Sequence, residues 1–279
     1  MDGIFVWNAD PVLIRITRNF QVGYYGVLFV AGLVLGYFIV QRIYRKEGIA
    51  TNQLDIILMH IVAGTIIGAR LGHCLFYEPE YFFSHPLEIV LPMKKMGDTW
   101  QFTGYRGLAS HGGSAGVFVA LMRYCYKYKV KPLWLLDRLS IPIPIAGAFI
   151  RMGNFMNSEI YGKPTNGKWG VIFKRASMLP RHPTQLYEVF CYLAVSAILY
   201  YLYLYKNNRK DGLLFAWFLI LLFGARVFVE FFKENQEAFE DSMTFNMGQW
   251  LSVPFILSGV GLLIYIYYKR SQTQNLDAL

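Results

Sequence analysis

Residues 151–162 concentrate polar groups that could bind an anion. This stretch holds one guanidinium, two carboxamides, one carboxylate and two glycines. An arginine can bind a phosphate through two parallel N–H donors, and asparagine can both donate and accept hydrogen bonds. Glycine permits tight turns and close approach of the backbone to a ligand. The segment therefore predicts an anion-binding site, with these candidate residues: Arg151, Asn154, Asn157, Glu159 and Gly162.

Two further segments carry groups suited to the same chemistry. His111 precedes Gly112 and Gly113, which places a possible general base beside backbone N–H groups at an expected helix start. Exposed N–H groups at such a start favour anions. Downstream, a second helix start is expected at Pro183 and is followed by the carboxylate of Glu188. We treat Gly112, Gly113 and Glu188 as supporting residues.

The histidines and cysteines do not predict a metal or a cofactor. The five histidines show no HExxH or other ligand spacing, and no nucleophile elbow or phosphate-binding loop is present. The three cysteines form no CxxC pair. The residues concerned are His60, His73, His85, His111 and His182, with Cys74, Cys125 and Cys191.

The elements that must position these groups are membrane helices. Hydrophobic residues make up 55% of the 279 residues and charged residues 16%, against about 25% charged residues in soluble domains. Several apolar runs approach the roughly 20 residues that cross a bilayer. We predict an all-α polytopic membrane protein, one integral membrane domain over residues 1–279. Its seven spans are expected at 24–40, 54–72, 112–129, 133–150, 184–205, 212–232 and 248–268.

Charge sets the expected orientation. In a seven-span chain all the basic clusters fall on one side, which the positive-inside rule makes cytoplasmic. The N-terminus is then outside and the C-terminus cytoplasmic, with long outer-face loops at 73–111, 151–183 and 233–247. The net charge of +9 is explained by these clusters, and no soluble basic domain suggests nucleic-acid binding. The clusters are Arg42, Arg45 and Lys46; Lys127, Lys129 and Lys131; Lys206, Arg209 and Lys210; and Lys269 with Arg270.

Pro132 directly precedes the fourth expected span, and Pro142 and Pro144 lie inside it. Proline inside a spanning helix removes a backbone donor and is tolerated where neighbouring groups satisfy the freed carbonyls. We therefore expect this span to be kinked or broken.

Costly polar groups inside the spans gather in their outer third. They are Tyr25, Arg70, His111, Arg151, Glu188, Arg226 and Glu230. Each has an alternative reading. Arg226 and Glu230, at i and i+4, could form a structural ion pair, and Arg70 could reach lipid phosphates. Tyr25 could belong to the interfacial aromatic belt, and His111 could be a plain interfacial residue. Their clustering favours one polar cavity open to the outer leaflet.

The chain resembles the prolipoprotein diacylglyceryl transferase family. Residues 151–162 match the family signature Arg-x-Gly-Asn-Phe-x-Asn-x-Glu-x-x-Gly at every fixed position. Four further segments agree: Tyr25-Gly26, residues 111–113, residues 182–188, and Arg226 with residues 230–232 followed by 247–249. These matches run from the first expected span to the last.

The resemblance implies an enzyme of the bacterial inner membrane whose active site faces the periplasmic leaflet. It implies transfer of the diacylglyceryl group of phosphatidylglycerol to the lipobox cysteine thiol of a preprolipoprotein, giving a thioether and glycerol phosphate. Arg151 and Arg226 would hold the phosphate, and His111 would accept the thiol proton. The remaining residues would shape the headgroup pocket (Tyr25, Asn154, Asn157, Glu159 and Gly162) or support it (Arg70, Gly112, Gly113, Glu188 and Glu230).

Two other functions fit parts of the pattern. A transporter would use intramembrane charges and a broken helix, but it predicts a polar path through the inner halves of the spans, where no such charges lie. A non-catalytic lipid-binding scaffold would need the arginines and asparagines but not His111.

Overall fold

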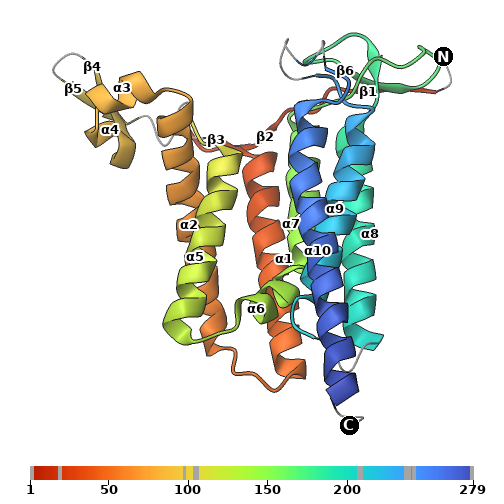
Figure 1. The fold of residues 1–279 in the computed structure, drawn as a ribbon. Helices are drawn as coiled ribbons and strands as arrows, with labels where there is room; N and C mark the ends of the chain where they lie inside the picture. Colours follow the sequence, from red (N-terminus) through yellow and green to blue (C-terminus); the bar gives the residue numbers. More distant parts are fainter. Residues whose placement is uncertain are drawn as a thin grey trace. The chain divides into compact units, whose positions relative to one another are not determined.

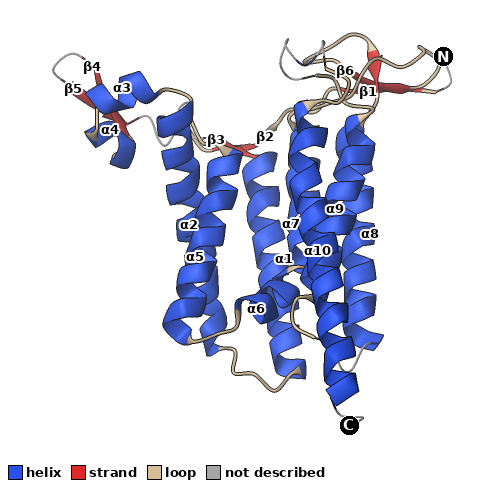
Figure 2. Ribbon diagram, in the orientation of Figure 1, coloured by secondary structure: helices blue, strands red, loops and turns tan. Residues whose placement is uncertain are grey.

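The computed structural model describes residues 3–17, 21–96, 99–102, 107–205, 210–235, 240 and 243–276. Two basic residues used in the orientation argument, Lys206 and Arg209, lie outside this range. The described chain is mostly helical (Figure 2) and forms two compact units. The first unit comprises residues 1–43 and 133–279, and the second comprises residues 44–132. A single integral domain stays a prediction.

Long helices build the first unit. They are α1 (Tyr24–Lys46, which continues past the unit boundary), α6 (Pro132–Leu139), α7 (Pro142–Met156), α8 (Thr184–Tyr205), α9 (Leu213–Glu230) and α10 (Met247–Leu276). α8 packs against α7 and α9, and α9 packs against α10 (Figure 1). Apolar residues of α7 and α8 form one core, in which Ala148, Val189 and Tyr192 are buried.

Short strands lie at one end of this helical bundle. β1 (Ile4–Trp7) pairs in parallel with β6 (Gly170–Phe173), which pairs with the antiparallel β7 (Pro180–Arg181). β2 (Val12–Arg15) and β3 (Gln21–Gly23) form a hairpin that leads directly into α1. β1 and β6 lie at the opposite end of the unit from the end of α10 (Figure 1). A second core of Phe155, Val171 and Phe173 joins the end of α7 to this sheet.

The second unit is organised around two antiparallel helices, α2 (Asn52–Phe76) and α5 (Ser110–Tyr128). Two short helices and a hairpin connect them: α3 (Pro79–Ser84), α4 (Leu87–Val90), β4 (Met93–Met96) and β5 (Thr99–Phe102). Glycines let the two long helices approach closely. A Cβ added to Gly68 would collide with the carbonyl oxygen of Gly112 and would lie 2.8 Å from the Cα of Gly116. Small residues at such spacing are typical of membrane helix pairs.

The predicted break in the fourth span is confirmed. α6 and α7 are bent by 45° at the residues between them. Pro142 and Pro144 lie in the first turn of α7, where a proline is tolerated because its missing N–H would have no partner within the helix. Neither proline can donate to the preceding turn, so the backbone of α6 cannot continue into α7.

A helix occupies each of the seven expected span positions, but not all are equally apolar. In the described part of the chain, five helices are long and apolar enough to cross a bilayer, and six if α6 and α7 count as one broken span. α5 is a helix of 19 residues outside that set. The structure therefore has the character of a polytopic membrane protein, while the number of seven spans stays a prediction. The all-α prediction was wrong in detail, because it omitted the short strands.

Candidate active site

The polar segment 151–162 is half helix and half turn. The sequence placed all of it in an outer-face loop, but α7 continues to Met156, and the turn begins at Asn157. The prediction was wrong because the polar residues keep helical hydrogen bonds: the Asn157 N–H still donates to the Gly153 carbonyl. Ser158 and Ile160 then adopt left-handed backbone angles, with φ of 57° and 56°. Such angles are rare in a β-branched residue and occur most often at functional sites.

A chain of side-chain hydrogen bonds organises this segment. The Arg151 guanidinium donates to Asn154 Oδ1 at 3.1 Å, and Asn154 Nδ2 donates to Glu159 Oε1 at 2.8 Å. Asn157 Nδ2 donates to the same Glu159 oxygen at 3.2 Å. Asn154 is buried, so its amide is held in one orientation by a donor on one side and an acceptor on the other. The carboxylate of Glu159 thus orients both asparagines.

A second chain, made of ion pairs, links α7, α8 and α9. Arg151 Nε lies 2.8 Å from Glu188 Oε2. Lys233 Nζ lies 3.1 Å from Glu188 Oε1 and 3.0 Å from Glu230 Oε1. Arg226 Nε lies 3.8 Å from the same Glu230 oxygen. We call these five residues the charge chain.

The charge chain carries three cations and two carboxylates, so it has one positive charge in surplus. Glu188 is fully buried, and Lys233 and Glu230 are 3% and 7% exposed. Buried charges are tolerated when they are paired and hydrogen-bonded. Arg226 is the least enclosed of the three cations, with 31% of its side chain exposed, and its Nε has no hydrogen-bond partner among the described residues. The surplus charge and the partly exposed side chain of Arg226 suit an anionic ligand.

Tyr25 and Gly162 are fixed by close packing around these chains. The Tyr25 ring lies against Gly153 of α7, where an added Cβ would come within 2.8 Å of the ring. Gly162 forms an antiparallel bridge with Lys233. A Cβ on Gly162 would lie 2.5 Å from the Phe232 carbonyl oxygen and 2.7 Å from His182 Cβ. Gly162 therefore allows the signature segment to contact the backbone that carries Lys233.

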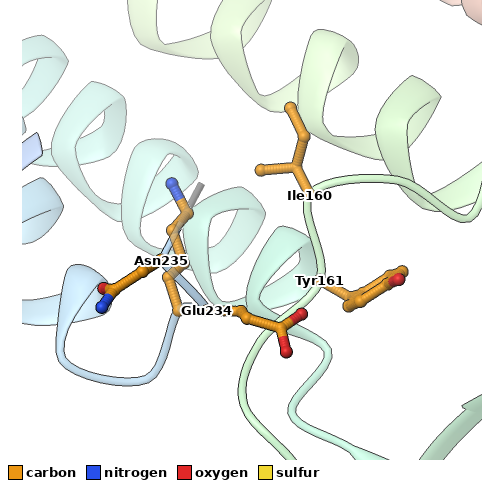
Figure 3. A pocket seen from close by; sticks show the side chains of 5 residues that line it. Ile160, Tyr161, Glu234 and Asn235 are labelled. Carbon is orange, nitrogen blue, oxygen red and sulfur yellow. The ribbon is translucent and has the colours of Figure 1, made fainter. Parts of the chain in front are cut away.

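A pocket of about 280 Å³ lies where these two segments meet (Figure 3). Its lining residues are Ile160, Tyr161, Lys233, Glu234 and Asn235. In Figure 3 the Glu234 carboxylate points toward the loop that carries Ile160 and Tyr161. Arg181 lies 2.9 Å from Glu234 and also stacks over the Tyr161 ring, 4.8 Å from its centroid. Arg181 therefore contacts two residues that line the pocket, Glu234 and Tyr161.

His182 lies in an aromatic setting next to the same wall. Its ring contacts Trp169 edge-on, with centroids 4.9 Å apart, and Phe232 at 5.4 Å. His182 Nδ1 lies 3.1 Å from the Tyr187 hydroxyl. Burial lowers the pKa of His182 below its ordinary value of 6.5, because the charged ring loses solvation. The sequence singled out this segment, but it did not indicate the aromatic enclosure.

Four predicted residues lie in the second unit. His111 is an exposed residue in the first turn of α5. The expectation of open N–H groups was wrong for Gly113, because α5 begins at Ser110 and the Gly113 N–H donates to Ala109 at 3.0 Å. Gly112 serves the close contact with α2.

Arg70 is used inside the second unit. Its guanidinium donates to the carbonyls of Glu88 and Ile89 and lies over the Phe82 ring, 4.7 Å from the centroid. Arg70 is buried, and these contacts attach α3 and α4 to the end of α2. The arginine therefore has a structural role here, whereas its predicted support of the headgroup site stays a prediction.

Known proteins resemble this chain over nearly its full length. A sequence profile of the family described as prolipoprotein diacylglyceryl transferase matches residues 11–265. The phosphatidylglycerol–prolipoprotein diacylglyceryl transferase of Tolumonas auensis is 48% identical over 259 residues, 92% of this chain and 96% of the relative. The proteins of the same name from Bacteroides fragilis and Chloroherpeton thalassium are 42% and 36% identical, each over at least 95% of this chain and 96% of the relative.

The chain belongs to the prolipoprotein diacylglyceryl transferase family. Membership of this family indicates a diacylglyceryl transferase, as the resemblance in the sequence predicted. The family signature is the segment from which both the hydrogen-bond chain and the charge chain start, at Arg151.

One member of the charge chain, Lys233, was not predicted from the sequence as a site residue. Lys233 was assigned only to the start of an outer loop. Its signal was present: it follows Glu230 by three residues and Arg226 by seven, the spacing of one helix face. What the spacing could not show is that Glu188, 45 residues away in the sequence, contacts the same ammonium group.

Proposed function

We propose that this protein transfers the diacylglyceryl group of phosphatidylglycerol to the lipobox cysteine thiol of a preprolipoprotein. Its family and the names of its relatives support this reaction. The observation that carries the proposal within the molecule is the charge chain, because it offers surplus positive charge and two arginines beside the family signature. A lipid phosphate is the anion that such a site in a membrane protein would meet.

In this reaction the thiol sulfur forms a bond to the glyceryl carbon, and the bond from that carbon to the phosphate oxygen breaks. The thiol proton goes to a base, and glycerol phosphate leaves with its electron pair on oxygen. Arg151 and Arg226 stabilise the negative charge of the leaving phosphate by charge-assisted hydrogen bonds. Glu188 and Glu230 hold these arginines through ion pairs. The headgroup pocket is shaped by Asn154, Asn157, Glu159, Tyr25 and Gly162, and their contacts in the first unit support this assignment.

His111 is the proposed base. An imidazole titrates near neutral pH, which suits it to accept a thiol proton. Its exposure at the start of α5 supports the role, because a base must be accessible to the incoming peptide. Arg70, Gly112 and Gly113 support it indirectly, by fixing α5 and the short helices on α2.

The proposed setting is the bacterial inner membrane, with seven spans, the N-terminus outside and the C-terminus in the cytoplasm. The candidate headgroup site then faces the periplasmic leaflet, where it would meet phosphatidylglycerol and the signal peptide of the preprolipoprotein. The positive-inside distribution of lysines and arginines supports this orientation. No metal or cofactor is assigned to the reaction.

The test is a transfer assay with the purified protein, phosphatidylglycerol vesicles and a peptide that carries a lipobox cysteine. The expected product is the thioether-linked diacylglyceryl peptide. Arg151→Ala and Arg226→Ala should each lower kcat/KM by about 100-fold or more, because each removes a donor to the leaving phosphate. The matched control is Arg175→Ala, since Arg175 is a solvent-exposed arginine of the same unit whose ion pair with Asp10 lies outside the charge chain.

No thioether product from folded wild-type protein would exclude the enzyme. Full activity of either arginine variant would remove that residue from the phosphate site. Within the same assay, His111→Asn should lose most of its activity near neutral pH, because no base at this position accepts the thiol proton. An unchanged pH profile in that variant would assign the base elsewhere.

A further inference from the structure

Lys233 occupies the centre of the charge chain. Its Nζ contacts one oxygen of Glu188 and one of Glu230, and both distances are those of direct hydrogen-bonded ion pairs. Its side chain is only 4% exposed. Its backbone is also fixed, since Lys233 bridges to Gly162 at the end of the family signature. A lysine with this burial is held in one conformation by its two partners.

The two carboxylates need a shared cation. Glu188 and Glu230 come from different helices, α8 and α9, and their Oε1 atoms meet at the same ammonium group. Without that group, two like charges would face each other in a buried region, where repulsion is strong. Each carboxylate also holds one arginine, so a change in either carboxylate would displace an arginine.

We infer that Lys233 is a positioning residue that couples Arg151 to Arg226, so that both guanidinium groups are held for a single phosphate. This inference rests on the proposed function for its ligand. In this scheme Lys233 acts through the two carboxylates to which its Nζ donates. Its positive charge also supplies the surplus that makes the site attractive to an anion.

The other charged and titratable neighbours fit this arrangement. The Tyr192 hydroxyl of α8 lies 3.3 Å from Glu188 Oε1. On the other side, Asn246 Nδ2 donates to Glu230 Oε2 at 3.1 Å. These neutral groups add hydrogen bonds, so among the described residues Lys233 is the cation that both carboxylates contact.

The first test compares neutral and charged replacements of Lys233 in the transfer assay. Lys233→Met should lower kcat/KM by about tenfold or more, because a buried pair loses one partner. Lys233→Arg should be at least about threefold more active than Lys233→Met, because it keeps the charge although its larger side chain must fit a buried site. Lys163→Met is the matched control. Lys163 follows Gly162, which forms the bridge with Lys233, but its exposed Nζ contacts only the Phe231 carbonyl among the described residues.

A second variant separates the loss of the lysine charge from the loss of its packing. It is informative even where Lys233→Met folds poorly. In Lys233→Met with Glu230→Gln, one carboxylate is neutralised together with the lysine, so the like-charge repulsion is gone. This double variant should be more thermally stable than Lys233→Met alone, by several degrees in detergent. Equal loss in Lys233→Met and Lys233→Arg, or no gain in the double variant, would overturn the inference.

Wild-type protein in the same assay distinguishes this failure from a failure of the proposed function. If wild type gives no thioether product, the proposed reaction is wrong, and the stability comparison alone then decides whether Lys233 couples the carboxylates. If wild type is active and Lys233→Met matches it in kcat/KM, the reaction stands and the positioning role falls.

Discussion

The two units hold their candidate residues by different physical means. In the first, Arg151 and Arg226 are held by buried ion pairs that run through Glu188, Lys233 and Glu230. In the second, His111 stands at the start of a helix that is fixed by backbone contact, with Gly68 of α2 against Gly112 of α5. The first unit positions its arginines by ion pairs, and the second positions His111 by close helix packing at glycines.

This difference decides how each unit responds to substitution. A buried ion-pair chain is sensitive first to charge, because removal of one member leaves another buried charge without its partner. A glycine contact is sensitive to volume and indifferent to charge, because even one methyl group has no space. A volume effect at the charge chain, or a charge effect at the contact between Gly68 and Gly112, would remove this contrast.

The largest expected effect is at Glu188. Glu188→Gln keeps the shape of the side chain and removes its charge, so Arg151 and Lys233 both lose their ionic partner. Breaking a buried pair in this way costs about 3–5 kcal/mol. We expect a clear fall in the thermal unfolding temperature of the detergent-solubilised protein, together with loss of transfer activity.

Glu234→Gln is the control for this effect. Glu234 belongs to the same unit and pairs with Arg181, but 46% of its side chain is exposed. Exposed pairs contribute about 0–1 kcal/mol, so this variant should unfold close to the wild-type temperature. Equal losses in the two variants would show that burial of the charge chain does not govern stability in the first unit.

The next effect in size is at the glycine contact of the second unit. Gly68→Ala adds a methyl group that collides with the Gly112 carbonyl oxygen. Overpacking of a tight interface costs about 1–3 kcal/mol. Thermal unfolding should show this loss, whereas Gly261→Ala in α10, where nothing lies within 4 Å of the added Cβ, should be close to wild type. A Gly68→Ala protein as stable as wild type would mean that the helices can separate at no cost.

The parts of this fold that could be predicted are those with a local signal. Apolar runs predicted a helix at each of the seven positions, and Pro142 and Pro144 predicted the break before α7. The polar signature predicted a shared site, and its members Arg151, Asn154 and Glu159 do contact one another. In each case the structural feature depends on residues that are close together in the sequence.

The parts that could not be predicted depend on segments far apart in the chain. Residues 4–7 pair with residues 170–173 in a parallel register, and no turn between them signals this pairing. Lys233 meets Glu188 only because α8 and α9 pack together. The end of α7 was misplaced for a different reason, since polar residues resemble a loop even where their backbone N–H groups remain in the helix.

The smallest expected effect is a pH dependence that arises at His182 in the first unit. His182 is enclosed by Trp169, Tyr187 and Phe232, and burial lowers the pKa of its ring below 6.5. The unfolded chain, with the ordinary value, therefore binds a proton first as the pH falls. The stabilising contribution of the neutral ring is fully present above about pH 6.5 and is lost progressively below it.

Unfolding temperatures at about pH 8 and about pH 5.5 measure this effect, because an ordinary histidine titrates between them. Wild type should lose more stability on acidification than His182→Gln, which has no group to protonate at that position. Gly68→Ala should lose as much as wild type, since its methyl collision involves no titratable group. An equal pH dependence in wild type and His182→Gln would contradict the prediction, because the enclosed ring would then take up its proton as readily as in the unfolded chain.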